Sequence, residues 1–271
     1  MPDRLDVHDR NACEARLLEW GLAGPVPNSR EANLRAIRLL LDGVVFYTFG
    51  IDRVADAARR GLLDEAGLVA LMARVNGHAR PEDFLGEMGE IKARAAYDGL
   101  VEAAGLFGRV VARKGTIAFG TGHPGSMLSC YNRLAAYARS RGATIAQAKA
   151  GLPVGVDWYL DYVGDVAVTS DYCGVLHGHA TRPMEQVIAN AGPLDLVVGD
   201  HGHAGAAINA GIATLAIMDT NDPALAVAKQ LGCDPLVVVP LFDNRPNAVT
   251  VQLADLFVAM VEAGATARGL C

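Results

Sequence analysis

Two short apolar runs, each followed at once by polar and ionisable residues, constrain the fold of this chain more than any other feature. The runs are Leu194–Val198 and Ile212–Met218, and the small residues of Ala204–Ala210 between them suit a helix. Apolar runs of this length that alternate with helical segments are typical of buried parallel strands. The stretch from Leu194 to Asp222 therefore predicts a strand–helix–strand unit of an α/β sheet.

The same alternation continues on both sides of this unit, from Lys114 onward. The expected strands are Thr116–Gly120, Ala143–Ala148, Val156–Tyr162, Asp165–Thr169, Gly174–Leu176 and Leu236–Pro240. The expected helices are Met127–Arg141, Pro183–Ala191, Pro223–Leu231 and Val249–Ala263. This order predicts an α/β domain over residues 114–271, with a doubly wound, mostly parallel sheet of the Rossmann-like kind.

Residues 1–113 have the periodicity of helices and contain no convincing strand. The expected helices include Asp6–Trp20, Ile51–Arg60, Asp64–Val75 and Ile91–Val111. Their apolar stripes are too broad to remain in contact with water. We therefore expect this helical region to pack on the α/β domain, where it could cover a site or form a dimer surface.

Composition limits the partners that this chain can have. Its 271 residues are 51% hydrophobic, which is enough for a sizeable core, and its formal charge of −6 argues against a nucleic-acid or anionic-membrane binder. No stretch approaches the roughly 20 apolar residues of a membrane-spanning helix. Five dispersed cysteines without a CxxC pair favour a reducing compartment. We expect a cytoplasmic protein, for which a homo-oligomer is compatible with the sequence.

A glycine-rich turn follows the first expected strand of the sheet. In open α/β sheets ligands bind beyond the carboxyl ends of the strands, and backbone N–H groups at a helix N-terminus can bind an anion. The turn therefore predicts a phosphate-binding cradle, although its glycines could serve backbone shape alone. It has neither the Walker lysine nor GxGxxG, so the sequence shows no nucleotide-cofactor motif. The expected ligand-binding residues of the turn are Thr121, Gly122, His123, Gly125 and Ser126.

Ionisable residues follow the two apolar runs. Asp200, His201 and His203 come after the first, and Asp219 comes directly after the second. Imidazoles and carboxylates in this arrangement are compatible with a divalent metal ion of unknown identity, or with acid–base catalysis. A structural turn capped by Asp200 is the alternative. Asp222 precedes a proline and reads as a helix N-cap, so Asp219 is the preferred functional residue.

A third group lies between the hairpin and the helix that begins at Pro183. His179 could act as acid, base or ligand, and the planar guanidinium of Arg182 can bind phosphate. A local ion pair between Arg182 and Glu185 is the alternative for the arginine. A loop that contains Asp243 forms a weaker fourth group.

Several spaced motifs agree in order with one known family. They are GTGHPGSML, HATRPMEQVI, GDHGHAGAAINAGI and DTNDPALAVAKQLG, followed by VPLFDN. Over Thr116 to Phe257 the chain resembles actinobacterial proteins known simply as phosphatases, which implies phosphomonoester chemistry on an undefined substrate. The chain is richer in histidine than that family at 177–179 and 201–203. The positions that match its motifs are Gly122, His123, Pro124, His179, Arg182, Pro183, Glu185, Asp200, Gly205, Asp219, Asn221, Asp222, Asp243 and Asn244.

These features together predict a hydrolase, a phosphatase that acts on a small phosphorylated metabolite such as a sugar or nucleoside phosphate. Asp200, His201 and Asp219, with His203 as a further candidate, would hold a divalent metal and its water. His179 or His203 would protonate the leaving oxygen. A phosphosugar-binding or isomerising protein with the same anion cradle and no metal is the alternative, and a regulatory binding module is a third.

Overall fold

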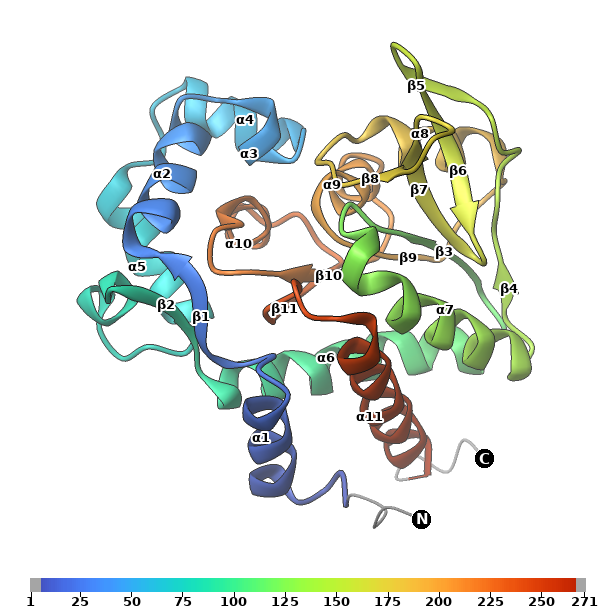
Figure 1. Cartoon of the computed structure of the whole chain (residues 1–271), viewed down its shortest axis with the longest axis horizontal. Coiled ribbons are helices and arrows are strands. Elements are labelled where there is room, and N and C mark those ends of the chain that lie inside the picture. The colour runs from blue at the N-terminus through green and yellow to red at the C-terminus, as the bar shows by residue number, and fades with distance from the viewer. Residues whose placement is uncertain (1–5, 267–271) are drawn as a thin grey trace.

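A central sheet organises the computed structural model, which describes residues 6–266. The sheet has the order β11-β10-β9-β3-β7-β6-β5, with β4 beside β3 and β8 beside β7 (Figure 1). The strands from β11 to β7 are mutually parallel, whereas β6, β5 and β8 add antiparallel pairs. The predicted α/β, mostly parallel sheet is confirmed. Its strands are β3 (Thr116–Gly120), β4 (Thr144–Ile145), β5 (Pro153–Gly155), β6 (Trp158–Val163), β7 (Val166–Ser170), β8 (Val175–Leu176), β9 (Leu196–Gly199), β10 (Thr214–Met218) and β11 (Leu236–Pro240).

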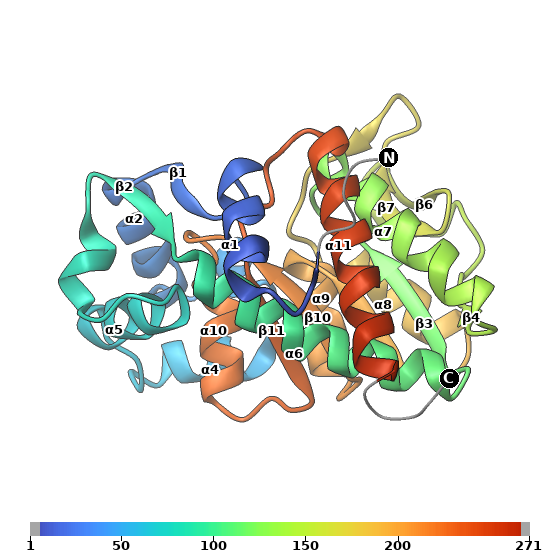
Figure 2. The same ribbon diagram turned by 90° about the horizontal axis from the view of Figure 1, so that it is seen from below.

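Helices cover both faces of this sheet because its strands alternate their side chains between the faces. On β3, Ile117 and Phe119 belong to one apolar cluster and Ala118 belongs to another. The first cluster includes α1, α6, α7 and α11, and Figure 2 shows these helices on one side of the sheet. The last helix of the N-terminal region is α6 (Ala93–Ala112). The helices that follow it are α7 (Pro124–Ser140), α8 (Arg182–Asn190), α9 (His201–Asn209), α10 (Pro223–Gln230) and α11 (Asn247–Thr266).

The N-terminal region is mainly helical, but the expectation that it holds no strand is wrong. Here β1 (Gly24–Ser29) and β2 (Met88–Ile91) form a two-stranded antiparallel sheet. Pro25 and Pro27 obscured β1, because proline cannot donate to a strand ladder and is confined to edges. The other elements are α1 (Arg10–Glu19), α2 (Arg30–Leu41), α3 (Val45–Thr48), α4 (Asp52–Arg59), α5 (Glu65–Val75) and the 3-10 helix η1 (Pro81–Leu85).

Helix α6 joins the N-terminal region to the core of the sheet. Its Phe107 packs with Phe119 of β3 and with Phe257 of α11. A Cβ atom on Gly99 would lie 3.2 Å from the Cα atom of Val239, so the glycine lets α6 approach β11 closely. The two parts therefore share one apolar cluster. A division into domains at residues 113 and 114 stays a prediction.

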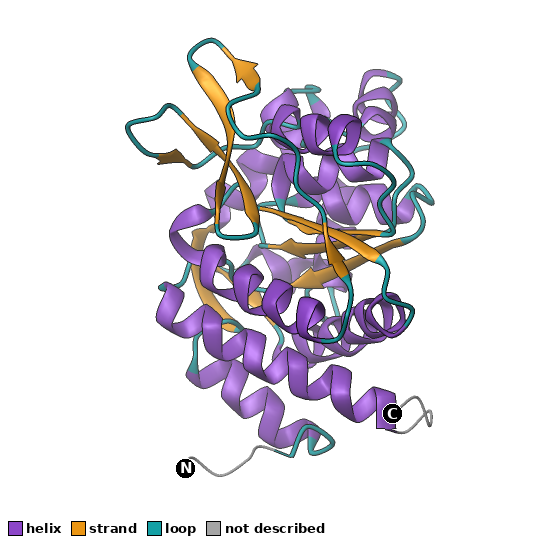
Figure 3. Cartoon of the chain, turned by 90° about the vertical axis from the view of Figure 1, so that its right-hand side faces the viewer, coloured by secondary structure: helices purple, strands orange, loops and turns teal. Residues whose placement is uncertain are grey.

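Two segments of the sheet differ from expectation. The strand expected at Ala143–Ala148 is only the two residues of β4, because the chain leaves β3 after the bond from Ala146 N to Ile117 O. Strands β5 and β6 form a hairpin that rises away from the parallel strands (Figure 3). Within residues 6–266, none of the helices has the length and apolar character needed to cross a membrane.

Candidate functional site

A cluster of histidines and carboxylates lies where four parallel strands end. His123 follows β3, His201 follows β9, Asp222 follows β10 and Asp243 follows β11. The segment between β8 and α8 adds His177 to the same place. Because parallel strands end at one edge of a sheet, residues distant in the sequence converge there.

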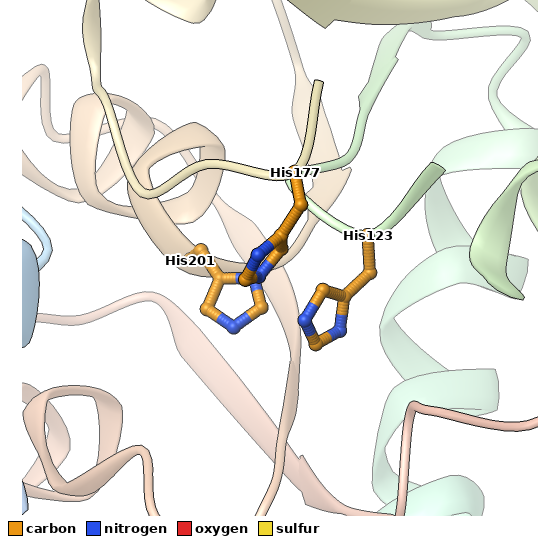
Figure 4. A group of neighbouring side chains, drawn as sticks. All are labelled: His123, His177 and His201. Atoms are coloured by element: carbon orange, nitrogen blue, oxygen red, sulfur yellow. The ribbon is translucent and has the colours of Figure 1, made fainter. Parts of the chain in front are cut away.

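Four imidazole rings pack against one another in this cluster (Figure 4 shows three of them). The ring centroids of His123 and His201 are 4.4 Å apart, and those of His123 and His177 are 4.5 Å apart. His179 stacks on His201 with centroids 4.1 Å apart and planes at 17°. Such crowding is costly unless most rings stay neutral or meet an opposite charge, so the partners of each ring decide its role.

Asp200 orients His201. Its fully buried carboxylate accepts hydrogen bonds from Thr121 Oγ1 and Gly122 N, each at 2.6 Å, and contacts His201 Nδ1 at 3.0 Å. Burial raises the pKa of Asp200, but the hydrogen bonds and charge of His201 outweigh burial and lower it. The ionised carboxylate can only accept, so His201 Nδ1 donates and Nε2 is left for another partner. Although Asp200 occupies the N-cap position of α9, its side chain makes no capping bond.

Two buried carboxylates face His201 and His123. His201 Nε2 lies 3.5 Å from Asp222 Oδ2, and His123 Nδ1 lies 2.9 Å from Asp243 Oδ2. Burial lowers the pKa of both histidines, but their carboxylates reverse the shift and raise it. Asp222 occupies the predicted N-cap position without capping α10. Its carboxylate instead accepts from Asp219 N and contacts His201.

The donor set fits a divalent metal ion. His201, Asp222 and Asp243 can offer ligand atoms that all lie within 4.8 Å of one another, and so can His123, His177 and His201. Neither oxygen of Asp243 has a hydrogen-bond partner, and its contact with His123 is an ion pair only when that ring is protonated. Buried charges are normally paired or bound to metals, so this carboxylate is suited to a cation.

The expected metal group of Asp200, His201, His203 and Asp219 is spread over several environments. Of the four, His201 alone belongs to the two candidate ligand sets found within residues 6–266. His203 lies beneath β3, where a Cβ atom on Gly120 would be 2.3 Å from its Nδ1, and burial lowers its pKa to about 4. The roles of Asp200, His203 and Asp219 toward a ligand stay predictions.

Asp219 is held by the N-terminal region. Asn28 of β1 donates to Asp219 Oδ2 at 2.7 Å and to Thr220 Oγ1 at 2.9 Å. Thr220 N also donates to Asp219 Oδ1. Burial, with the charges of Asp243 and Asp222, raises the pKa of Asp219 well above its ordinary value. Protonation of Asp219 limits the repulsion between its carboxyl group and the carboxylates of Asp222 and Asp243.

The glycine-rich turn already holds an anionic group, the Asp200 carboxylate. Thr121 and Gly122 donate to it, His123 N donates to Thr121 Oγ1, and Ser126 Oγ donates to the Asp243 carbonyl. Gly125 is exposed at the start of α7. Internal partners therefore occupy most of the donors expected to bind phosphate, and phosphate binding by this turn stays a prediction.

The remaining expected residues differ in exposure. His179 is buried, its Nδ1 donates to the Phe46 carbonyl at 2.8 Å, and burial, with the charge of His201, lowers its pKa to about 3. Arg182 is exposed and lies 3.8 Å from Glu185, as the ion-pair alternative predicts. Asn221 is half-buried on the loop after β10.

Four residues of the site, Asp222, Asp243, Asn28 and Phe46, are more important in the structure than the sequence indicates. Asp222 and Asp243 were assigned to a cap and to a weak loop group, although each follows a strand of the same sheet edge, as the preferred Asp219 does. That shared position was the available signal. Asn28 and Phe46 belong to the N-terminal region, and no local pattern marks their approach to residues roughly 130 to 190 positions later.

Comparison with known proteins confirms the resemblance. A model of the protein family described as Phosphatase matches residues 8–263. The protein named Phosphatase SCO2771, from Streptomyces coelicolor (strain ATCC BAA-471 / A3(2) / M145), is 32% identical over 234 residues, which are 84% of this chain and 86% of that protein. The match to the family model extends well beyond the motifs and includes the N-terminal region that supplies Asn28. The chain belongs to the Phosphatase family and is a phosphate-removing hydrolase.

Proposed function

We propose that this protein hydrolyses phosphomonoesters of small metabolites, such as a sugar or nucleoside phosphate, with the help of a divalent metal ion. The observation that carries the proposal is the buried group of His201, Asp222 and Asp243, whose ligand atoms lie within 4.8 Å of one another while the Asp243 carboxylate faces the ring of His123. A cation there would offset two buried carboxylates in one small volume.

His201, Asp222 and Asp243 would hold this ion, and His123 and His177 would face the substrate phosphate beside it. When bound, a divalent metal supplies an activated water and shields the charge of the phosphate. His201 suits a metal ligand because Asp200 holds its Nδ1 hydrogen, which is the usual second contact of a metal-bound histidine, and a metal ion would take the place of the Nε2 proton beside Asp222.

His123 is the residue placed to deliver a proton. It is half-buried at the edge of the cluster, and its contact with Asp243 raises its pKa against the effect of burial. It can therefore carry a proton near neutral pH to the leaving oxygen, which is the contribution of a general acid. His179 is less suited to that role, because its Nδ1 hydrogen is bound to a backbone carbonyl.

The test measures phosphate release and metal content together. We would assay the purified protein on a panel of phosphate esters before and after dialysis against a chelator, and measure bound metal by mass spectrometry. Asp222→Asn and Asp243→Asn should both lower metal content and cut kcat by at least about a hundredfold. Full activity with no bound metal in the parent protein would overturn the metal proposal.

Asp255→Asn is the matched control. Asp255 lies on α11, is exposed, and pairs with Arg133 rather than with the histidines. The same chemical change at this position should leave metal content and turnover at the parent values. A panel on which the parent releases no phosphate, with or without added divalent ions, would contradict the proposed substrate class.

A further inference from the structure

An exposed apolar segment lies beside the histidine cluster. Val44, Val45 and Phe46, at the start of α3, expose 37%, 67% and 46% of their surfaces. Consecutive exposed apolar side chains next to a polar site are unfavourable in water and mark a place where a ligand packs. Tyr172 and Val175 are also exposed, and Val175 is two residues before His177.

Phe46 is the member of this segment that contacts the site directly. Its ring stacks on His179 with centroids 3.6 Å apart and planes at 17°, and its carbonyl accepts from His179 Nδ1. His179 in turn stacks on His201. Three flat rings therefore form a column that begins at the candidate metal ligand His201 and ends at the exposed ring of Phe46.

Phe49 holds this column from the side. Its buried ring meets His179 and His201 edge-on, with centroids 5.0 Å from each. Aromatic rings attract one another in both stacked and edge-to-face arrangements. The inner rings of the column are thus enclosed, whereas Phe46 has one face against His179, meets the ring of Tyr47 at 62° with centroids 5.2 Å apart, and retains exposed surface. That surface can stack a further flat group.

We propose that Phe46 binds the leaving group of the substrate, and that the substrate is a phosphomonoester whose alcohol carries a flat aromatic ring, as a nucleoside monophosphate does. The inference rests on the proposed function, because it places the phosphate at the histidine and carboxylate cluster. Stacking on an aromatic side chain strengthens the binding of any nucleobase, whichever hydrogen-bonding groups it carries, since every base has a π face.

The aromatic end of the column favours a nucleoside phosphate over a sugar phosphate. Phe46 lies two ring layers from His201, at 4.1 Å and 3.6 Å. A sugar phosphate bound at His201 and Asp243 carries no flat ring that could stack on Phe46. A base attached to that sugar supplies such a ring.

Adenosine monophosphate and ribose phosphate test this inference, because they share the phosphate and the sugar and differ only by the base. The parent protein should show a kcat/KM at least about tenfold higher for the adenosine compound, mainly through KM. Phe46→Ala should remove most of that preference and leave ribose phosphate within about twofold of the parent. Phe46→Tyr keeps the ring and should keep the preference.

The comparison of two substrates separates leaving-group binding from damage to the site. Phe46→Ala retains the backbone carbonyl that holds His179, and any remaining disturbance of the histidines would affect both substrates equally. An equal fall for both would therefore overturn the proposal and leave Phe46 as a support for His179. Leu62→Ala, which removes an exposed apolar side chain between α4 and α5, should change neither value.

Equilibrium binding tests the same inference without turnover. In the His123→Gln background, which keeps the three proposed metal ligands, adenosine monophosphate should bind about tenfold more weakly when Phe46 is alanine. An unchanged affinity would overturn the role of Phe46 even if the parent hydrolyses no phosphate ester. Absence of hydrolysis with Phe46-dependent binding would instead contradict the proposed function and retain the aromatic ligand.

Discussion

His201 donates a hydrogen bond from Nδ1 to Asp200 Oδ1 over 3.0 Å, although the two residues are neighbours in the chain. The contact requires an unusual backbone, since His201 has a φ angle of 44° in the left-handed region that favours glycine. His201 is the first residue of α9, and its conformation is consistent with strain retained at a functional position. Thr121 and Gly122 complete the arrangement by donating to the same carboxylate.

The first prediction concerns Asp200→Asn. Asparagine keeps one acceptor oxygen and replaces the other with an NH2 group, so it cannot accept from Gly122 and His201 and also from Thr121, and the buried negative charge beside His201 is lost. We expect the free energy of unfolding to fall by about 2–4 kcal/mol and turnover to fall strongly. Chemical denaturation and a phosphate-release assay measure the two effects.

Asp64→Asn is the control for this change. Asp64 caps α5 by accepting from Gly67 N at 2.7 Å, and asparagine caps helices about as well as aspartate. The free energy of unfolding of the Asp64→Asn variant should differ from that of the parent by only about a few tenths of a kcal/mol. Equal effects at both positions would mean that the buried hydrogen bonds of Asp200 contribute no more to stability than an exposed helix cap does.

The second prediction compares two glycines in one turn. A Cβ atom on Gly122 would lie 2.1 Å from the carbonyl oxygen of Gly178, which is the residue between His177 and His179. Gly122→Ala must therefore push the histidine segment away and should remove most of the activity. A Cβ atom on Gly125 would meet no atom within 4 Å, so Gly125→Ala should fold normally and retain activity.

Circular dichroism melts and turnover of both glycine variants would separate the outcomes. Gly122→Ala should also lower the free energy of unfolding by about 1–3 kcal/mol, because the new methyl group would collide with a backbone carbonyl, which cannot move aside as a side chain can. If Gly122→Ala retains the activity of the parent, the contact between the turn and the histidine segment is irrelevant to catalysis. Loss of activity in Gly125→Ala alone would indicate that the outer part of the turn binds the substrate.

The third prediction concerns the dependence of stability on pH. Burial lowers the pKa of His203 to about 4, whereas an unfolded histidine titrates near 6.5. Below about pH 6.5 the unfolded state therefore binds a proton that the folded state does not, so stability falls as pH falls toward the folded pKa. Between pH 7 and 5, this residue should cost the parent about 2 kcal/mol of unfolding free energy.

His203→Gln removes this titration. Urea denaturation of parent and variant at pH 7 and pH 5, both in chelator, should show that the variant loses about 2 kcal/mol less on acidification. Parallel losses in the two proteins would show that His203 is not buried in its neutral form.

The sequence predicted the sheet because its signals are local. The runs that became β9 and β10 are continuous and apolar, and each is buried on both faces as parallel strands are. The β1 strand was missed because its stability comes from pairing with β2, about sixty residues later, and not from its own proline-rich sequence.

The candidate site was only partly predictable for a similar reason. Position after a strand places His123, Asp200 and His201 at one edge, but it cannot rank Asp222 above Asp219 as a partner of His201. The ranking depends on which carboxylate meets His201 and which meets Asn28, and these are contacts across more than twenty and about 190 residues. Burial also lowers the pKa of His179 to about 3, and no local pattern in the sequence shows that burial.

The last prediction tests whether residues 114–271 fold independently. In the whole chain α6 covers the sheet, with Phe107 against Phe119 and Phe257, and β1 supplies Asn28 to Asp219. A fragment of residues 114–271 would expose that face of the sheet and lose the donors of Asn28. We expect it to be aggregated or loosely folded, without phosphatase activity.

A longer fragment that begins at Lys92 restores α6 but not Asn28. It should therefore be soluble and still lack phosphatase activity. Size-exclusion chromatography, thermal melts and turnover of the three chains measure these properties. Cooperative melting of 114–271 alone would show that two independent domains meet at residue 113.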